Sequence, residues 1–349
     1  MHRISFSGIE NKTHPNAKKR NFDFKQNKLI HSQKDSLVDE IVDLFSMYIK
    51  NSFSGTGEWK WLQENKQKNF INSLIKSNSK EISDYLNNMF RNEVTYGYIS
   101  PSFSDALKQE LHVASDILCN IDTCAEFTDL STESQLETIH GNPFGLIGEN
   151  GLILPDTSRH FYYANVISKL LKAKINPSIL EIGGGYGGLC LQTWNRYEGK
   201  CTITNVDLLP ALITTYFYLS KNKIPVNFVR SKEDFKINSV NLIEANSSKL
   251  LNSMIDQVDL VFNSRSLCEM SKETISQYLD FINLSNADYF YHENSNFVLF
   301  PDSERHLEII AEDFPLDKTK YALEFSCVTP FTGGRGRYRE YIFKKTLIF

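Results

Sequence analysis

The sequence lacks the long apolar runs and the paired cysteines that mark several classes of protein. No apolar stretch approaches the ~20 residues that a membrane-spanning helix needs, and the opening residues lack the apolar core of a secretory signal. The six cysteines are scattered without a CxxC pair, so neither a disulfide framework nor a zinc site is indicated. We therefore expect a cytoplasmic protein with no membrane span and no structural metal.

A strong excess of either charge is also absent. The 349 residues carry a formal net charge of −4, which offers no basic field for nucleic acid, so we expect no nucleic-acid partner. Residues 1–34 are a local exception, because Lys and Arg greatly outnumber Asp and Glu there. Their polar composition predicts a flexible basic arm, with a nucleic-acid or membrane-surface arm as the alternative.

Helical periodicity begins near residue 36 and continues through the first third of the chain. Apolar residues recur at helical spacing over 38–49, 82–90, 107–118 and again over 161–171. Between the last two, residues 140–158 concentrate Gly, Pro and Asn, which predicts a loop or a short hairpin. We therefore predict a helical N-terminal domain over residues 35–150.

The pattern changes after Pro177, where short apolar strands begin to alternate with helices. Strand–helix alternation indicates an α/β domain with a mainly parallel sheet that is covered on both faces. We place this domain at residues 151–349. The predicted strands are 178–182, 201–206, 225–230, 241–245, 258–262, 287–292, 321–328 and 338–345, and helices are predicted at 187–197 and 209–221.

A glycine-rich loop opens the α/β domain at residues 179–188, ILEIGGGYGG. Glycine allows tight turns and close approach of a ligand to the backbone, and the helix that follows offers free N–H groups. Gly183, Gly185 and Gly188 satisfy G-x-G-x-x-G, and Gly187 lies in the same loop. This motif alone does not separate NAD from S-adenosylmethionine.

Three neighbouring features favour S-adenosylmethionine, and the half-chain resembles a class I methyltransferase that depends on it. Glu181 precedes the glycines, where that class places an acid near the cationic methionine end and where a pyrophosphate would be repelled. Asp207 ends the next strand and suits the ribose hydroxyls, although it could instead cap a helix. The chain closes with two aromatic-rich strands that resemble the antiparallel sixth and seventh strands of that fold. The resemblance implies a Rossmann-like, seven-stranded sheet.

Later segments resemble the sugar O-methyltransferase family of bacterial polysaccharide clusters. The resemblance covers roughly residues 140–349. It rests on Asp259–Met270, Tyr291–Asn294 and Tyr338–Phe343, with Gly141–Pro143 and Arg159–Ala164 fitting its upstream region. It implies S-adenosylmethionine-dependent methylation of a sugar hydroxyl, free, nucleotide-linked or glycan-borne. The helical domain would then cover the acceptor side of an otherwise open cleft.

The chemistry limits where the site residues lie. A protonated hydroxyl is a poor nucleophile, so a base or a metal helps, and ligands of an open α/β sheet bind beyond the carboxyl ends of the strands. His292 is the leading base and Glu269 the second, while Glu293 would orient His292 or bind the cofactor. The candidates are His292, Glu269 and Glu293 for catalysis; Glu181, Gly183, Gly185, Gly187, Asp207, Asn246 and Asn263 for the cofactor; and Arg159, Tyr163, Arg265 and Arg335 for the acceptor.

Alternatives remain open for several of these residues. His292 could be an edge-of-sheet histidine bonded to backbone, and Glu269 could be a solvated or helix-capping carboxylate. Asn246 borders the adenine if Val240–Ala245 is the third strand of the sheet, and caps a helix otherwise. Arg335 contacts a phosphate or lies in an exposed hairpin turn.

The function also has alternatives. These are methylation of another small molecule or of a peptide, at oxygen or nitrogen, a non-catalytic methyltransferase-like binding subunit, and a nicotinamide-dependent oxidoreductase. A divalent metal is compatible with the chemistry but is not indicated by the sequence, and a homodimer is compatible with the helical domain.

Overall fold

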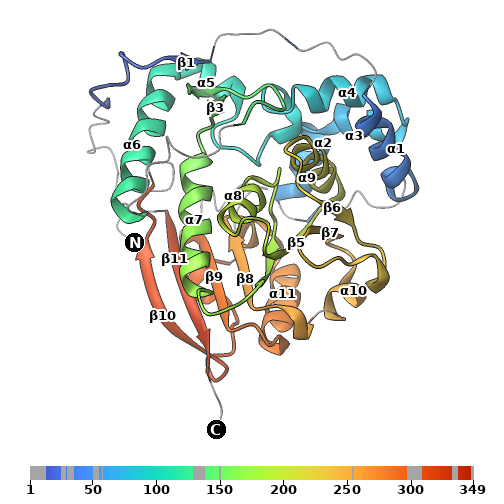
Figure 1. Ribbon diagram of the computed structural model, residues 1–349, viewed down its shortest axis with the longest axis vertical. Helices are drawn as coiled ribbons and strands as arrows, with labels where there is room; N and C mark the ends of the chain where they lie inside the picture. The colour runs from blue at the N-terminus through green and yellow to red at the C-terminus, as the bar shows by residue number, and fades with distance from the viewer. Residues whose placement is uncertain are drawn as a thin grey trace.

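The computed structural model describes residues 13–24, 29, 35–49, 55–56, 58–128, 138–148, 151–253, 255–296, 309–331 and 337–346. Its helical N-terminal part lies across the upper side of a large sheet in Figure 1. The two parts share a continuous core, because buried residues of both pack into one hydrophobic cluster.

Among the described residues, six helices build the N-terminal part, where helical periodicity predicts three at 38–49, 82–90 and 107–118. The apolar stripe of the first helix, with Val38, Ile41 and Phe45, is buried, and this helix contacts α9 of the sheet domain. Side-chain caps start two of the others, since Asn78 accepts from the Glu81 N–H and Ser102 accepts from the Asp105 N–H. The helices are α1 (Ser36–Ile49), α2 (Glu58–Asn65), α3 (Lys68–Ile75), α4 (Ser79–Asn87), α5 (Phe103–Lys108) and α6 (Glu110–Thr128).

A small three-stranded sheet contains the predicted hairpin and residues of the predicted flexible arm; residues 1–12, 25–28 and 30–34 of that arm lie outside the described residues. Strands β2 (Gly145–Ile147) and β3 (Leu152–Ile153) pair antiparallel, and β1 (Phe22–Asp23) pairs with β2. Phe24 is fully buried, and Asp23 accepts from Arg91 at 3.1 Å. Residues 13–24 are therefore fixed to the helical part and not flexible as predicted. The basic composition of this segment predicts flexibility, but its few apolar side chains pack into the core.

In the part of the chain that the structure describes, the large sheet has eight strands in the order β10-β11-β9-β8-β4-β5-β7-β6. The resemblance implied seven; the additional edge strand is β6, and β7 lies beside β5 as the third strand we preferred. Only β11 runs against the others: β10 pairs antiparallel with β11 and thus runs with β9, so one of the two final strands, not both, is reversed. The strands are β4 (Ser178–Ile182), β5 (Thr202–Asp207), β6 (Val226–Phe228), β7 (Val240–Glu244), β8 (Leu260–Ser264), β9 (Tyr289–Ser295), β10 (Tyr321–Val328) and β11 (Tyr338–Lys345).

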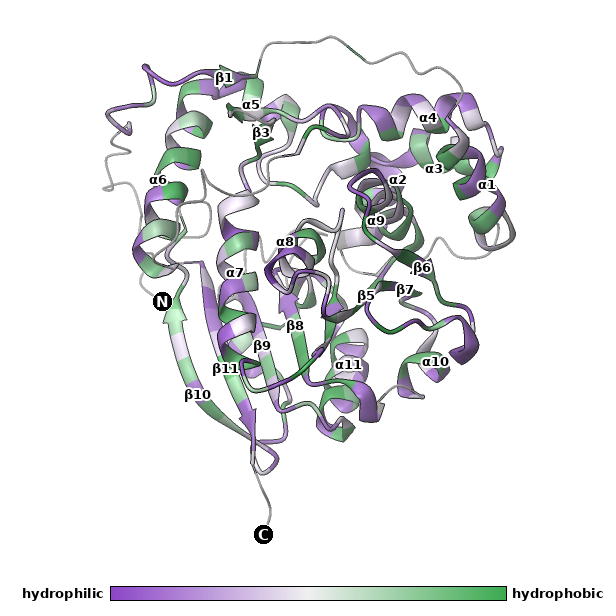
Figure 2. Cartoon of the chain, viewed as in Figure 1, coloured by the Kyte–Doolittle hydropathy of each residue, from purple (hydrophilic) through white to green (hydrophobic). Residues whose placement is uncertain are grey.

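Helices cover both faces of this sheet. Side chains alternate between the two faces along each strand, so that Ile179 packs toward α7 (Thr157–Leu170) while Leu180 packs with α11 (Lys272–Leu284). Helices α8 (Gly188–Arg196) and α9 (Leu209–Lys221) lie on the α7 face, and α10 (Ser248–Asn252) joins α11. Figure 2 shows the mixed hydrophobic and hydrophilic sides that such covering helices need. Short 3₁₀ helices occur at Glu93–Thr95, Lys232–Asp234, Ile255–Gln257, Leu267–Glu269 and Ala311–Asp313.

Within the described part of the chain, no helix combines the length and the apolar character needed to cross a lipid bilayer.

Candidate functional site

A cavity of about 810 Å³ lies at the carboxyl ends of β4, β5, β7 and β8. Segments of the N-terminal part, including residues 96–102, form its opposite wall, and α7 and α11 close the sides. Ligands of open α/β sheets bind at this position, and a volume of ~300–1,000 Å³ is ordinary for a small-molecule site.

The glycine loop forms the floor of the cavity beneath these segments. Gly183 and Gly185 line the cavity with φ of +72° and +57°, a region that side chains rarely adopt. A Cβ on Gly183 would collide with the Ser266 hydroxyl, and one on Gly185 would lie 3.2 Å from the Tyr98 Cβ. Gly187 does not line the cavity; with a φ of +87° it precedes the first turn of α8.

Two carboxyl groups stand beside this loop. Asp207 at the end of β5 accepts from the Gly185 N–H at 2.8 Å and from the Leu208 N–H at 2.7 Å, which fixes the loop to the strand. Glu181 accepts from the Cys190 thiol at 3.1 Å. Burial raises the pKa of each to about 7, and the nearby Asp207 charge adds to the effect on Glu181. Among the described residues neither has a Lys or Arg partner in an ion pair, so this end of the cavity favours a cationic ligand.

The adjacent wall carries an arginine pair built around the fully buried Glu293. The Glu293 carboxylate accepts from Arg265 Nε at 3.1 Å and Nη2 at 3.2 Å, from Ser264 at 3.0 Å and from the Tyr163 hydroxyl. Arg159 Nη1 lies 3.9 Å away. Although burial acts to raise it, these partners, Arg265 first, hold the pKa of Glu293 at about 2. Glu293 therefore stays ionised and fixes Arg265 and Arg159, which both line the cavity.

A second buried carboxyl group lies directly opposite Glu293 in the β9–β11 ladder. Glu340 accepts from the Tyr291 hydroxyl at 2.8 Å and the Tyr162 hydroxyl at 3.2 Å. Burial, with the charge of Glu293, raises its pKa to about 7, so the pair holds one ionised and one largely protonated carboxyl below that pH.

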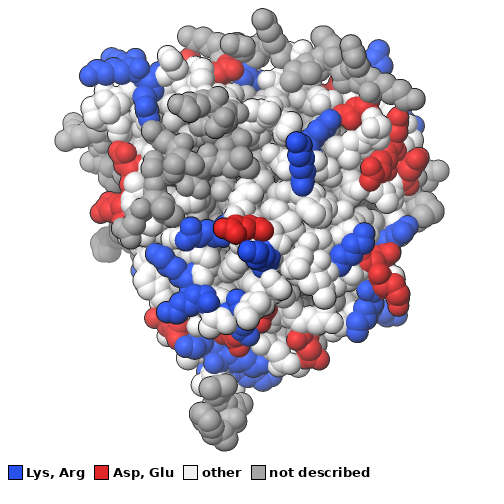
Figure 3. All heavy atoms as spheres, viewed as in Figure 1, with Lys and Arg blue, Asp and Glu red and all other residues white. Residues whose placement is uncertain are grey.

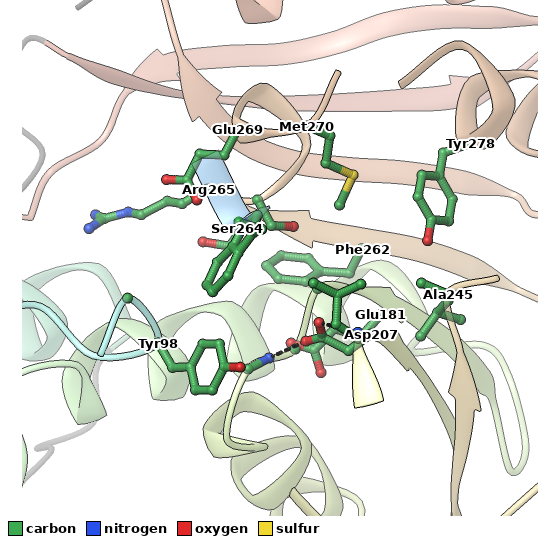
Figure 4. Close-up of a pocket in the computed structure, with 18 of the residues that line it drawn as sticks. Tyr98, Glu181, Asp207, Ala245, Phe262, Ser264, Arg265, Glu269, Met270 and Tyr278 are labelled. Atoms are coloured by element: carbon green, nitrogen blue, oxygen red, sulfur yellow. Dashed lines mark hydrogen bonds between the residues drawn. The ribbon is translucent and has the colours of Figure 1, made fainter. Parts of the chain in front are cut away.

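Aromatic contacts hold the wall that carries Arg265 and Arg159, the arginine wall, against the start of β11. The Arg265 guanidinium lies 4.4 Å from the centre of the Tyr338 ring, and that of Arg337 lies 4.8 Å from the same ring. Glu269 lines the cavity next to Arg265, as Figure 4 shows. The wall thus presents guanidinium, carboxylate and aromatic groups to whatever enters. The predicted residues that line the cavity are Glu181, Gly183, Gly185, Asp207, Asn246, Arg159, Arg265 and Glu269.

The structure does not support His292 as the general base. Its ring is 1% exposed and lies on the α11 face of the sheet, among Phe290, Phe314, Tyr341 and Phe343 at centroid distances of 4.8–5.8 Å. Burial lowers its pKa to about 3. The prediction was wrong because β9 continues to Ser295 instead of ending near residue 292, so His292 lies within the sheet and points away from the cavity.

Glu293, Asn263 and Tyr163 are also buried in the protein and do not line the cavity. Asn263 donates to the Ile182 carbonyl at 2.7 Å and accepts from Asn294 at 2.8 Å, so its amide connects neighbouring strands instead of meeting a ligand. Tyr163 contacts Glu293, and Glu293 reaches the cavity through Arg265, Arg159 and Ser264, which line it. Arg335 lies outside the described residues.

Several lining residues escaped the sequence analysis. Trp59 and Tyr98 belong to the N-terminal part, His160 follows Arg159 in α7, and Met270 and Tyr278 lie beyond β8 on the α11 side. No motif spacing connects Trp59 or Tyr98 to the glycine loop. The turn-forming composition of residues 96–101, YGYISP, is the one local signal that could have drawn attention to this segment.

Within the described ranges, no group of three or more His, Cys, Asp or Glu side chains is arranged to hold a metal ion.

Comparison with known proteins gives similarity at the level of solved structures. No family model matches the chain, and no curated protein matches it. A class I S-adenosylmethionine-dependent methyltransferase from Listeria monocytogenes is 14% identical, with 90% of this chain and 88% of that chain covered and a TM-score of 0.40. The small RNA methyltransferase HEN1 is 18% identical over 58% of this chain and 28% of its own, with a TM-score of 0.41. TrmN from Thermus thermophilus is 11% identical over 53% of this chain, with a TM-score of 0.35, and this chain spans 49% of its length.

Proposed function

We propose that this protein is a class I methyltransferase that uses S-adenosylmethionine to methylate a hydroxyl group of a sugar. The observation that carries the proposal is the pair of cavity carboxyl groups, Glu181 and Asp207, beside the glycine loop. A pyrophosphate would be repelled by them, whereas a sulfonium cofactor with an ammonium group and ribose hydroxyls is attracted.

The residues of this end fit the parts of such a cofactor. Glu181 would face its cationic methionine end, Asp207 its ribose hydroxyls, and Asn246, at the end of β7, its adenine. Gly183 and Gly185 line the cavity beside both carboxyl groups, and their lack of a side chain lets Ser266 and Tyr98 pack directly on the loop. When bound, S-adenosylmethionine supplies an electrophilic methyl group.

The remaining cavity residues would bind and activate the acceptor. We assign Glu269 as the group that accepts the proton of the acceptor hydroxyl, because it lines the cavity whereas His292 does not. Arg265 and Arg159, held by Glu293, would orient acceptor oxygens, and the N-terminal segments would exclude water from the reacting groups. No step of this proposal requires a metal ion.

Sugar hydroxyls suit this wall because Arg159, Arg265 and Glu269 offer donors and an acceptor in a confined space. The family resemblance of residues 140–349 supports the same acceptor class. The net charge of −4 favours a small acceptor over a nucleic acid, and acidic and basic side chains are interspersed on the face shown in Figure 3. Cytoplasmic location and a homodimer stay predictions.

Calorimetry with S-adenosylhomocysteine and NAD tests the cofactor. We expect micromolar binding of the former, none of NAD, and loss of binding in Gly185→Val, whose side chain would meet Tyr98 and be strained at this φ. Gly199→Ala, at a positive φ beyond the end of α8, is the matched glycine control. Binding of NAD alone would replace the proposal by an oxidoreductase.

Incubation with methyl-labelled cofactor and a panel of sugars, nucleotide sugars, peptides and a short RNA tests the acceptor. Label on a sugar oxygen is the expected result. Label on RNA, on a peptide or on nitrogen would contradict the sugar assignment, and cofactor binding without any transfer would favour a binding subunit.

A further inference from the structure

One segment of the N-terminal part contacts the glycine loop. Residues 96–102 line the cavity, and the Tyr98 side chain lies against Gly185, where an added Cβ would be 3.2 Å from the Tyr98 Cβ and 3.5 Å from its ring. Figure 4 shows the Tyr98 ring pointing toward Asp207. Tyr98 is therefore next to both residues that fix the cofactor end of the cavity.

This segment is anchored at several points. Ile99 is 4% exposed and packs into the shared core, and the Ser100 N–H donates to Asp156 Oδ2 at 3.0 Å. The buried Gln67 amide donates to the Val94 carbonyl at 3.2 Å and to the Tyr96 carbonyl at 3.4 Å. These contacts fix the position of Tyr98 at the edge of the cavity before any ligand binds.

Trp59 supports the exposed side of Tyr98. Its ring and the Tyr98 ring are stacked with centroids 5.3 Å apart and planes at 25°, and both residues line the cavity. Trp59 lies near the start of α2, so the stack joins two separate segments of the N-terminal part. A stacked aromatic pair offers a large, rigid apolar surface at a low cost in side-chain entropy.

We propose that Tyr98, supported by Trp59, is a cofactor-binding residue whose ring, next to Gly185 and directed toward Asp207, packs against the adenosyl group. The inference rests on the proposed function and extends it, because the sequence analysis gave the N-terminal part a role toward the acceptor alone. The cofactor site is then composite: the sheet domain supplies the polar contacts and the helical part supplies the apolar wall.

Calorimetry with S-adenosylhomocysteine tests the wall directly. Tyr98→Ala is expected to weaken binding by about tenfold or more, while Tyr98→Phe stays near wild type because the ring is kept. Tyr85→Ala is the matched control: Tyr85 packs on Phe70 at 5.6 Å in the same helical part, away from the cavity. Equal losses in Tyr98→Ala and Tyr85→Ala would indicate general loosening and overturn the proposal.

Tryptophan fluorescence provides a readout that needs neither acceptor nor turnover. The chain has three tryptophans, Trp59, Trp61 and Trp194, and of these only Trp59 lines the cavity. S-adenosylhomocysteine should change the emission of the wild type, of Trp61→Phe and of Trp194→Phe, but not that of Trp59→Phe. A full response in Trp59→Phe would overturn the proposal.

These outcomes separate this inference from the proposed function. A wild-type chain that binds no S-adenosylhomocysteine contradicts both. A wild type that binds it, with Tyr98→Ala equally tight, contradicts the role of Tyr98 alone.

Discussion

The pKa values of the carboxyl groups are shifted in opposite directions at the two ends of the cavity. At the glycine loop, burial raises the pKa of Glu181 and Asp207 to about 7. Around Glu293, which is fully buried, Arg265 and Arg159 hold the pKa of the carboxyl group at about 2. The difference lies in the partner, because burial disfavours the charged form in every case and a neighbouring cation reverses the sign.

The two kinds of carboxyl group therefore have different roles, one within the protein and one toward a ligand. Glu293 already has its cations, so its charge is used within the protein to place two arginines. Glu181 and Asp207 have no such cation among the described residues, so a positively charged ligand would gain most from them. The predictions below test this division, from the largest expected effect to the smallest.

Glu269→Gln should have the largest effect on chemistry. If Glu269 accepts the acceptor proton, turnover should fall by about 10²–10⁴ while the affinity for S-adenosylhomocysteine stays near wild type. Single-turnover methyl transfer measures the former and calorimetry the latter. Glu273→Gln, an exposed acid at the start of α11 away from the cavity, is the control. Wild-type turnover in Glu269→Gln would remove the base and leave proximity to explain catalysis.

Glu293→Gln should destabilise the fold strongly. It leaves Arg265, whose side chain is 15% exposed, without its carboxylate, and breaking such a largely buried pair typically costs about 3–5 kcal/mol in the free energy of unfolding. Glu340→Gln, directly opposite in the ladder, removes a carboxyl that is largely neutral below pH 7 and should cost below ~1.5 kcal/mol. Urea denaturation compares the two variants. Equal losses in the free energy of unfolding would show that the arginines are not what keeps Glu293 ionised.

The same contrast predicts opposite pH dependences. The pKa of Glu293 is depressed, so its stabilising contribution is complete above about pH 5 and is lost as pH falls toward 2. The pKa values of Glu181 and Asp207 are raised, so they lower the free energy of unfolding as pH rises from about 4 to 7. When the free energy of unfolding is measured against pH, Glu293→Gln should therefore remove a rise between about pH 2 and 5. Glu181→Gln should remove part of the fall between about pH 4 and 7.

The affinity for the cofactor should depend on the ionisation of Glu181 and Asp207. If the cationic ligand binds the ionised form of Glu181, affinity should rise about tenfold between pH 6 and pH 8, and Glu181→Gln should flatten the rise. Calorimetry at several pH values measures this. A flat wild-type profile would show that these carboxyl groups do not sense the ligand charge.

His292→Phe should have the smallest effect. The histidine is buried, neutral and surrounded by aromatic rings, so phenylalanine fits the same site and loses one contact with Asn294 at 3.3 Å. We expect turnover within about twofold and a stability loss of about 1 kcal/mol. A fall in turnover of 10² or more would return His292 to the mechanism.

The sequence predicts the cofactor end of the site better than the acceptor end, and the reason is local. Glu181, the glycines and Asp207 lie within or just after short strands whose apolar patterns define their ends. By contrast, β9 carries the polar run His292–Ser295 inside the sheet, where the pattern predicts that the strand has ended. Polar residues that bond to one another within a sheet look like a loop in the sequence.

Contacts between distant segments account for the other differences. Tyr98 meets Gly185 through tertiary packing alone, and Asp23 meets Arg91 in the same way. Neither pair lies within one periodic segment, so helical or strand periodicity holds no information about it. The fold class, the hairpin and the place of β7 depended on local patterns and were therefore predictable.

The facing pair of Glu293 and Glu340 has an evolutionary consequence. Arg265 and Glu293 form one unit, since loss of either removes the main charged partner of the other, whereas the Glu340 carboxyl accepts from two tyrosine hydroxyls. In related sequences, positions 265 and 293 should therefore change together or not at all. Position 340 should vary independently of them and accept glutamine, because an amide oxygen accepts the same two hydroxyl groups without a proton to store.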